Sequence, residues 1–473
     1  MLFNTLDFAL FLPLVLLLYW TLFRRDLRWQ NIFLVLVSYI FYAFWDWRFL
    51  SLIFLSSLVD YLVGRQLGKS GSPLKRRLLL CISLFFNLGL LVVFKYFNFF
   101  VDTFVDTFAL FGTKFNRSSW NILLPVGISF YTFQTLSYTI DIYRKRIQPT
   151  SDPIAFFAFV SFFPQLVAGP IERASNLLTQ FETKRLFHYK KNVSGLRLIL
   201  GGLFKKMVIA DNCALVVNTI FENYQDQSGS TLFFGAVFFA FQIYGDFSGY
   251  SDIAIGVSRL LGFDLMRNFN YPYLAQNMSD FWRRWHISLS TWFRDYVYIP
   301  LGGSRVSRTR LIVNILIVFL VSGLWHGANL TFVFWGFVHA LFVIPVVLFF
   351  KKEAAFNASR KWPTLREIIN IGSTFFVVVI AWVFFRAETI TDAFQYLEIV
   401  FSKSLFTKPY IPRIGILLLF LYMVFEWMQR DREHVLDIGY IDSKLLRYSI
   451  YYLVVFGIFY YAGNLQPFIY FQF

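Results

Sequence analysis

Long apolar runs separated by short basic connectors constrain this chain more than any other feature of its sequence. About twelve such runs approach the roughly 20 residues that an α-helix needs to cross a bilayer core about 30 Å thick. Hydrophobic residues make up 57% of the 473 residues, and charged residues only 15%. An ordinary soluble domain is far less apolar. We therefore expect an all-α polytopic membrane protein.

The net charge of +16 would suggest nucleic-acid binding in a soluble protein. Here the Lys and Arg residues lie in the connectors, which the positive-inside rule explains more simply, so no nucleic-acid partner is expected. The connectors assigned to the cytoplasm are 24–28, 65–77, 144–146, 184–191, 305–310, 351–361 and 430–447. The weakly charged stretches assigned to the outer side are 100–121, 218–230 and 388–404. This alternation predicts that both chain ends lie outside.

Two stretches do not fit a simple crossing. Residues 154–170 lie between two basic connectors and should enter and leave on the same side, and Pro164 and Pro170 interrupt a helix there. Broken backbone at membrane depth is tolerated only when it is buried in protein or lines a cavity, so this segment is predicted to be re-entrant. Residues 268–303 are too polar to face lipid. No repeat of 20 to 50 residues is evident, and residues 1–473 are expected to form a single membrane domain.

The segment Phe281-Trp-Arg-Arg-Trp-His286 concentrates charge in a largely apolar chain. Arg283, Arg284 and the nearby Arg294 have two interpretations. They are either ordinary positive-inside residues or a binding site for a phosphorylated donor that arrives from the cytosol. In the second case His286 would orient the donor or the substrate.

His326 ends the apolar run 311–325, and a second run, 330–350, follows almost at once. An ionisable group at membrane depth is costly and by default marks function. The alternative is a core histidine that bonds to a neighbouring helix. Trp325 and Asn329 flank the imidazole, and the Asn329 amide would orient it. A neutral imidazole with a pKa of about 6.5 can accept a proton from a hydroxyl.

A polar island that contains Asp246 and Asp252 lies within the apolar run 232–261. We expect these acids to pair with arginines or helix ends, and we place Asp246 among the residues that would support the site. The sequence contains no Ser nucleophile elbow, Walker loop or HExxH, and its two cysteines lack zinc-ligand spacing. Covalent serine, nucleotide and metal chemistry are therefore not indicated.

In combination these residues resemble the membrane-bound O-acyltransferase (MBOAT) family, in the bacterial branch of the alginate O-acetyltransferase membrane subunit. The matching stretches are 124–138, 162–173, 244–252, 280–303 and 325–329. The resemblance implies a ring of tilted helices around a thin central region with re-entrant segments. It implies that His326 is the principal catalytic histidine and His286 the second. It also implies acetyl-CoA or another acyl thioester as donor, with no tightly bound cofactor.

These expectations define a multi-pass enzyme of the bacterial cytoplasmic (inner) membrane. It would move an acyl group, with acetyl favoured, from a cytosolic thioester to a hydroxyl of an extracytoplasmic polysaccharide or partner protein. The expected partners are a periplasmic or extracellular acetyltransferase subunit and the polysaccharide acceptor, which need not be alginate. D-alanyl or other acyl transfer from a carrier protein is an alternative. Two rivals of other classes are a secondary transporter and a non-catalytic scaffold of a polysaccharide secretion complex.

Overall fold

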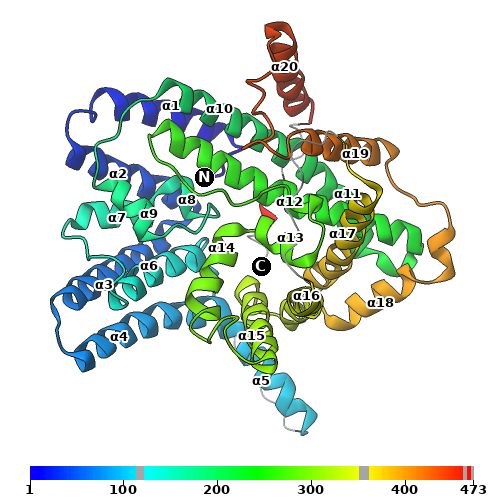
Figure 1. Cartoon of the computed structure of the whole chain (residues 1–473), viewed down its shortest axis with the longest axis horizontal. Coiled ribbons are helices and arrows are strands. Elements are labelled where there is room, and N and C mark those ends of the chain that lie inside the picture. The colour runs from blue at the N-terminus through cyan, green and yellow to red at the C-terminus, as the bar shows by residue number, and fades with distance from the viewer. Residues whose placement is uncertain (113–121, 351–361, 462–465, 470–473) are drawn as a thin grey trace. The chain divides into compact units, whose positions relative to one another are not determined.

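The computed structural model describes residues 1–112, 122–350, 362–461 and 466–469, and across these ranges the chain forms helices without strands (Figure 1). The all-α prediction is therefore confirmed. Contacts divide the chain into two compact units, Met1–Asn192 with Val257–Met266 and Val193–Gly256 with Arg267–Phe473. The predicted basic connector 351–361 and residues 113–121 of an outer stretch lie outside the described residues.

The first unit is built mainly from helices that precede residue 192. These are α1 (Leu6–Thr21), α2 (Leu27–Asp46), α3 (Leu50–Lys69), α4 (Pro73–Leu91), α5 (Phe97–Leu110), α6 (Ile128–Tyr143), α7 (Pro153–Ser161), α8 (Phe163–Leu166) and α9 (Ala174–Phe181). Helix α3 packs against α6 and α4. Gly64 permits this approach, because a Cβ there would lie 2.6 Å from the Tyr138 ring.

Residues 154–170 form a broken helix, as the two prolines predict. Helix α7 has nine residues, or about 14 Å of length, which is too short for a bilayer core of about 30 Å. The chain bends at Phe162 before the single turn of α8. Phe156, Phe159 and Phe163 are fully buried, so the broken backbone is enclosed in protein. The segment is not a simple crossing, and the side on which its ends lie stays a prediction.

The second unit contains the helices that follow residue 192. These are most of α10 (Tyr189–Phe204), α11 (Asp211–Glu222), most of α12 (Gly229–Leu260), α13 (Met278–Arg284), α14 (Ile287–Phe293), α15 (Arg308–His326), α16 (Leu330–Phe349), α17 (Leu365–Arg386), α18 (Ile390–Val400), α19 (Arg413–Met428) and α20 (Lys444–Tyr461). Helices α13 and α14 have seven residues each. Residues 268–303 therefore contain no helix long enough to cross a membrane, as their polarity predicts.

Fewer helices are long and apolar enough to cross a membrane than the sequence suggested. Six stretches qualify among the described residues: Leu27–Lys69, Pro73–Ala109, Gly229–Leu260, Arg308–His326, Leu330–Phe349 and Leu365–Arg386. The expectation of about twelve runs of spanning length is not met, because several apolar runs form shorter helices. Helices α1, α6 and α19 have 16 residues each. The chain is nevertheless a multi-pass membrane protein by the length and composition of its helices.

Glycines bring α10 close to α12, the 32-residue helix that supports the site. A Cβ at Gly249 would lie 2.7 Å from the carbonyl oxygen of Gly202, and one at Gly245 would lie 2.9 Å from that of Lys205. Small residues allow membrane helices to pack backbone to backbone in this way. The crossing places the π-helical turn Lys205–Ala210 beside the polar island of α12.

Candidate active site

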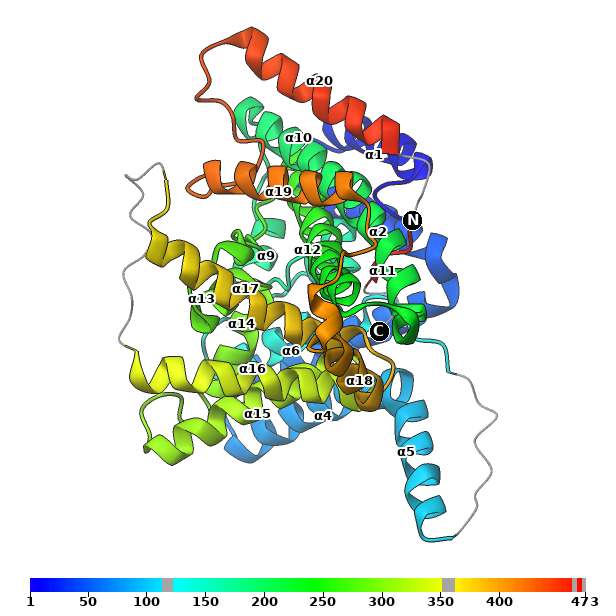
Figure 2. The same cartoon turned by 90° about the vertical axis from the view of Figure 1, so that its right-hand side faces the viewer.

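His326 is the last residue of α15 and lies where the chain turns back into α16. The two helices pack side by side (Figures 1 and 2). Their backbones approach at Gly323 and Gly336, where a Cβ would collide with the carbonyl groups of Phe332 and Phe319. The imidazole is 4% exposed. A rigid helix hairpin thus holds His326 at a helix end, inside the protein.

His286 is fully buried and occupies the position before α14, with left-handed backbone (φ 42°). The side-chain oxygen of Asn268 lies 3.1 Å from His286 Nδ1, and it accepts the Ser288 hydroxyl at 2.9 Å. Because a carbonyl oxygen can only accept, Nδ1 must be the protonated nitrogen. His286 Nε2 then has a lone pair, so this nitrogen is a hydrogen-bond acceptor.

The structure brings the two histidines together, with 6.4 Å between their ring centroids. Trp325 lies 6.1 Å from His286 and 5.0 Å from His326, and Trp335 and Phe385 lie 5.1 and 5.5 Å from His326. Burial lowers the pKa of His286 to about 3, because a charged imidazole is poorly solvated there. His286 is therefore neutral at physiological pH.

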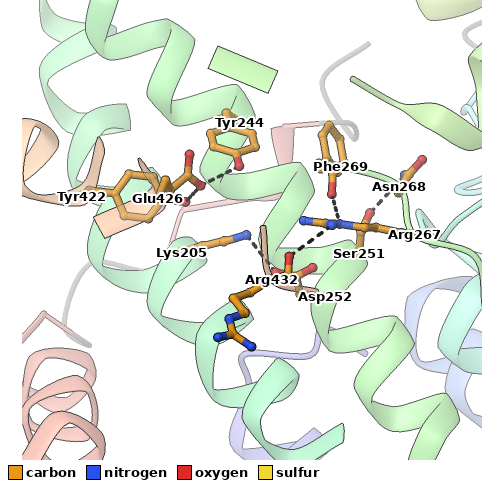
Figure 3. Close-up of polar contacts among 10 residues, drawn as sticks. All are labelled: Lys205, Tyr244, Ser251, Asp252, Arg267, Asn268, Phe269, Tyr422, Glu426 and Arg432. Carbon is orange, nitrogen blue, oxygen red and sulfur yellow. Dashed lines mark hydrogen bonds and ion pairs between the residues drawn. The ribbon is translucent and has the colours of Figure 1, made fainter. Parts of the chain in front are cut away.

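Polar residues of α12 bond to Asn268, the residue that contacts the His286 ring, and Figure 3 shows the contacts around Asn268. Asn268 donates from its amide to the Ser251 hydroxyl at 3.2 Å, and the next residue, Asp252, forms an ion pair with Lys205 at 2.8 Å. Because these bonds restrain the Asn268 side chain, they also limit how the His286 ring bonded to it can move.

A second cluster of polar residues binds the buried carboxyl of Glu426. One of its oxygens accepts the hydroxyls of Tyr244 and Tyr422, each at 2.6 Å (Figure 3). Tyr244 lies in the polar island of α12, and Glu426 and Tyr422 lie on α19. These bonds join α19 to α12, the helix whose Ser251 bonds to Asn268.

Asp246 and Asp252 have ionic partners, as the sequence predicts, but these are lysines from the π-helical turn and not arginines. Lys206 lies 2.9 Å from Asp246 and 2.7 Å from Asp211. Asp246 also accepts the backbone N–H of Ile469 at 2.7 Å. These contacts give Asp246 a role in helix packing, so any support of the histidines is indirect.

Asn329 and Trp325 remain close to His326 but differ in what they contact. Asn329 accepts the backbone N–H of Thr331 at 3.1 Å, which caps α16, and donates its amide to the Glu388 carbonyl at 2.9 Å. Its described bonds therefore fix the chain after His326 and not the imidazole itself. Trp325 packs edge-on against the His326 ring.

The three arginines of the predicted donor site lie outside the histidine pair. Arg283 is exposed, and its side chain donates to the Ser279 carbonyl. Arg284 forms an ion pair with Asp280 at 3.0 Å. The Arg294 side chain is 58% exposed and lies 2.8 Å from Asp295. Arg283 and Arg294 are thus accessible to a charged ligand, whereas Arg284 is already compensated.

His339 is a candidate that the sequence argument missed. It lies on α16, is fully buried, and is surrounded by the rings of Trp282 and Trp335 at 5.0 and 4.7 Å and of Phe281 at 6.1 Å. Trp335 contacts both His326 and His339. The signal was present, because a histidine inside an apolar run is as costly as His326.

The described residues contain no group of three or more His, Cys, Asp or Glu side chains that could hold a metal ion. The site consists of two buried imidazoles, His286 and His326, among aromatic rings. An imidazole with an available ring nitrogen can exchange a proton with a substrate hydroxyl, so this pair is the candidate active site.

The chain belongs to the membrane-bound O-acyltransferase (MBOAT) family, whose model matches residues 41–387. It is 40% identical over 394 residues to the "Probable alginate O-acetylase AlgI" of Pseudomonas aeruginosa, covering 83% of this chain and 73% of that protein. It is 37% identical over 428 residues to the peptidoglycan O-acetyltransferase of Helicobacter pylori, covering 84% and 79%. The teichoic acid D-alanyltransferase of Bacillus subtilis is 27% identical over 267 residues, covering 53% and 66%.

Proposed function

We propose that this membrane-bound O-acyltransferase moves an acetyl group from a cytosolic thioester to a hydroxyl on the outer side of the bacterial cytoplasmic membrane. Acetyl-CoA is the proposed donor, and a polysaccharide or partner protein is the proposed acceptor. The relatives named for acetyl transfer are 40% and 37% identical to the chain, against 27% for the D-alanyltransferase. This difference favours acetyl over D-alanyl transfer.

His326 is the proposed general base. It takes the proton of the acceptor hydroxyl while the hydroxyl oxygen bonds to the thioester carbonyl carbon. The tetrahedral intermediate then breaks its carbon–sulfur bond, and the imidazolium returns the proton to the departing thiolate. The products are an ester and a free thiol, so atoms and charge balance.

His286 has a different proposed role because its protonation state differs. Asn268 accepts a hydrogen bond from the Nδ1–H group, and burial keeps the ring neutral. Nε2 is therefore suited to accept a hydrogen bond from the acceptor hydroxyl or from an amide N–H of the donor. It is not suited to neutralise an oxyanion.

The observation that supports this proposal best is the 6.4 Å spacing of two buried imidazoles from elements far apart in sequence. A core histidine needs one hydrogen-bond partner and no second imidazole. Two imidazoles at this spacing can contact the same reacting group.

Replacement of His326 tests the proposal. His326→Ala should lower acetyl transfer by about 10²- to 10⁴-fold, because a positioned base contributes roughly that factor. His326→Gln preserves most of the ring volume and should lose activity in the same way. The matched control is His188→Ala, since His188 is an exposed histidine outside the site. Acetyl transfer, donor binding and thermal stability are measured on the purified proteins. Near-normal transfer by a folded His326→Gln protein contradicts the proposal.

The rival functions give different results. A secondary transporter would show gradient-coupled flux in proteoliposomes without acetyl-CoA. A scaffold would keep its cellular function in a His286→Ala, His326→Ala double variant. A D-alanyltransferase would use a D-alanyl carrier-protein thioester in preference to acetyl-CoA.

A further inference from the structure

A polar pocket of about 320 Å³ lies at the ends of three helices of the second unit. It is lined by Phe221, Glu222, Tyr224, Arg386, Ala387, Glu388, Asp392 and Tyr396. These residues come from the end of α11 and the turn after it, from the end of α17, and from α18. The volume suits a single small ring such as a monosaccharide unit.

The pocket adjoins the chain segments that hold His326. Phe385, the residue before Arg386, packs 5.5 Å from the His326 ring. The Glu388 backbone carbonyl accepts the Asn329 amide, three residues beyond His326. His326 itself does not line the pocket, but the segment that contributes Arg386 and Glu388 to the lining also contacts the His326 ring and Asn329.

The pocket is lined by residues from two segments that their scarcity of Lys and Arg assigns to the outer side. Residues 218–230 contribute Glu222 and Tyr224, and residues 388–404 contribute Asp392 and Tyr396. The two segments are joined directly, because the Gly229 N–H donates to the Ser404 hydroxyl at 2.8 Å. An acceptor that arrives from outside would meet this pocket.

The lining combines flat aromatic rings with fixed polar groups. Phe221 stacks on Tyr396 with ring centroids 4.6 Å apart. The Arg386 guanidinium lies 5.5 Å from the centre of the Phe221 ring and 3.3 Å from the Asn218 side-chain oxygen. The Tyr224 hydroxyl lies 3.0 Å from a carboxylate oxygen of Asp392 and 2.7 Å from the side-chain oxygen of Gln395. Apolar ring faces with a few convergent polar groups are typical of small-ligand sites.

The charge of the pocket restricts what can bind there. Glu222, Glu388 and Asp392 contribute three negative charges, and Arg386 contributes one positive charge. Carboxylates accept hydrogen bonds from sugar hydroxyls, and such charge-assisted bonds are strong. A uronate unit would instead place its own carboxylate against an excess of negative charge, which is unfavourable.

We infer that this pocket is the acceptor subsite and selects an uncharged saccharide unit over a uronate. The inference rests on the proposed function for the identity of the transferred group, but binding to the pocket can be measured without transfer. The acceptor is thereby assigned to neutral glycans or to neutral units of a mixed polymer.

Binding is tested with the full-length protein in detergent, using fluorescently labelled oligomers of N-acetylglucosamine and of mannuronate of equal length. At low ionic strength the neutral oligomer should bind at least about tenfold more tightly. This preference should shrink as salt rises, because exposed charges are screened. Glu222→Gln combined with Glu388→Gln should weaken neutral binding and narrow the preference. Both side chains are exposed, so the variant is expected to fold.

Glu398→Gln is the matched control, since Glu398 is an exposed carboxylate of α18 outside the pocket. Equal affinity for both oligomers, or a double variant that behaves like this control, overturns the inference. The inference is also overturned if the wild-type protein binds neither oligomer but binds a basic partner protein that the double variant no longer binds. Acetyl transfer is measured in parallel. Transfer to the neutral oligomer with an unchanged KM in the double variant refutes the subsite alone, whereas binding without transfer to any acceptor refutes the proposed function.

Discussion

His286 adopts a backbone conformation that non-glycine residues rarely occupy. Its φ of 42° lies in the left-handed region, which costs roughly 1–3 kcal/mol. Asn268 offsets this cost, because its side-chain oxygen bonds to the ring, the Ser288 hydroxyl and the Ser288 N–H. The strained residue is thus held by neighbours that also set its tautomer, which is the arrangement expected of a positioned functional group.

Glu172 should make stability depend on pH. Burial is the main reason that its pKa rises from 4.5 to about 7, although the Met266 N–H and Asn176 side chain oppose the shift. Ionisation therefore costs more in the folded protein, so stability should be greatest below about pH 4.5 and fall as pH rises to about 7. The loss is at most about 3 kcal/mol. Glu172→Gln should flatten this dependence in thermal unfolding, whereas Glu398→Gln should not. If the melting temperatures of the wild-type and Glu172→Gln proteins change with pH in the same way, this expectation is contradicted.

Donor affinity should depend on the exposed arginines near His286. Coenzyme A has several phosphate charges, which Arg283 and Arg294 can neutralise. Arg283→Glu with Arg294→Glu should raise the dissociation constant for acetyl-CoA by about tenfold or more, with the largest effect at low salt. Arg308→Glu is the control, because Arg308 is also exposed but lies at the start of α15. If the paired reversal and the control bind acetyl-CoA equally well, the arginines are ordinary positive-inside residues.

At the scale of the elements, the crossing of α10 and α12 depends on glycine. In Gly249→Ala the new Cβ would lie 2.7 Å from the Gly202 carbonyl oxygen, so the helices must separate. Overpacking of this kind typically costs about 1–3 kcal/mol. Separation would also stretch the Lys205–Asp252 pair next to Ser251. We therefore expect a lower melting temperature and reduced transfer.

Gly372→Ala on α17 is the control for this prediction, since no atom lies within 4 Å of a Cβ added there. Alanine is the better helix former by up to about 1 kcal/mol, so this variant should be neutral or slightly stabilised. Equal melting temperatures for the two variants would show that the crossing tolerates a methyl group.

At the scale of the whole molecule, the sidedness of the connectors is testable by cysteine labelling in intact cells. Cys81 is exposed, so it is first replaced by serine. Probes at Ser151 and Lys190, both exposed, should report the cytoplasmic side, and a probe at Glu388 should report the outer side. Opposite results for Ser151 and Lys190 would overturn the re-entrant assignment of residues 154–170.

Composition and connector charge were sufficient to predict the membrane class and the broken segments, because apolar length and proline act locally. The position of an ionisable residue between two apolar runs was likewise sufficient to select His326 as a candidate functional residue. The same rule would have found His339, which the flanking motifs of the other two histidines obscured. The family was recognisable because its characteristic stretches are contiguous in sequence.

Only the tertiary structure decided which of these residues meet. His286 and His326 come together because α13 packs against α16 and the turn Arg294–Tyr298 packs against α15, and hydropathy does not encode those contacts. The partners of Asp246 and Asp252 are lysines because glycine contacts set the α10–α12 crossing. Sequence periodicity reports which face of a helix is apolar, whereas the choice among apolar neighbours depends on side-chain shape and on buried polar pairing. Those are properties of the packed chain.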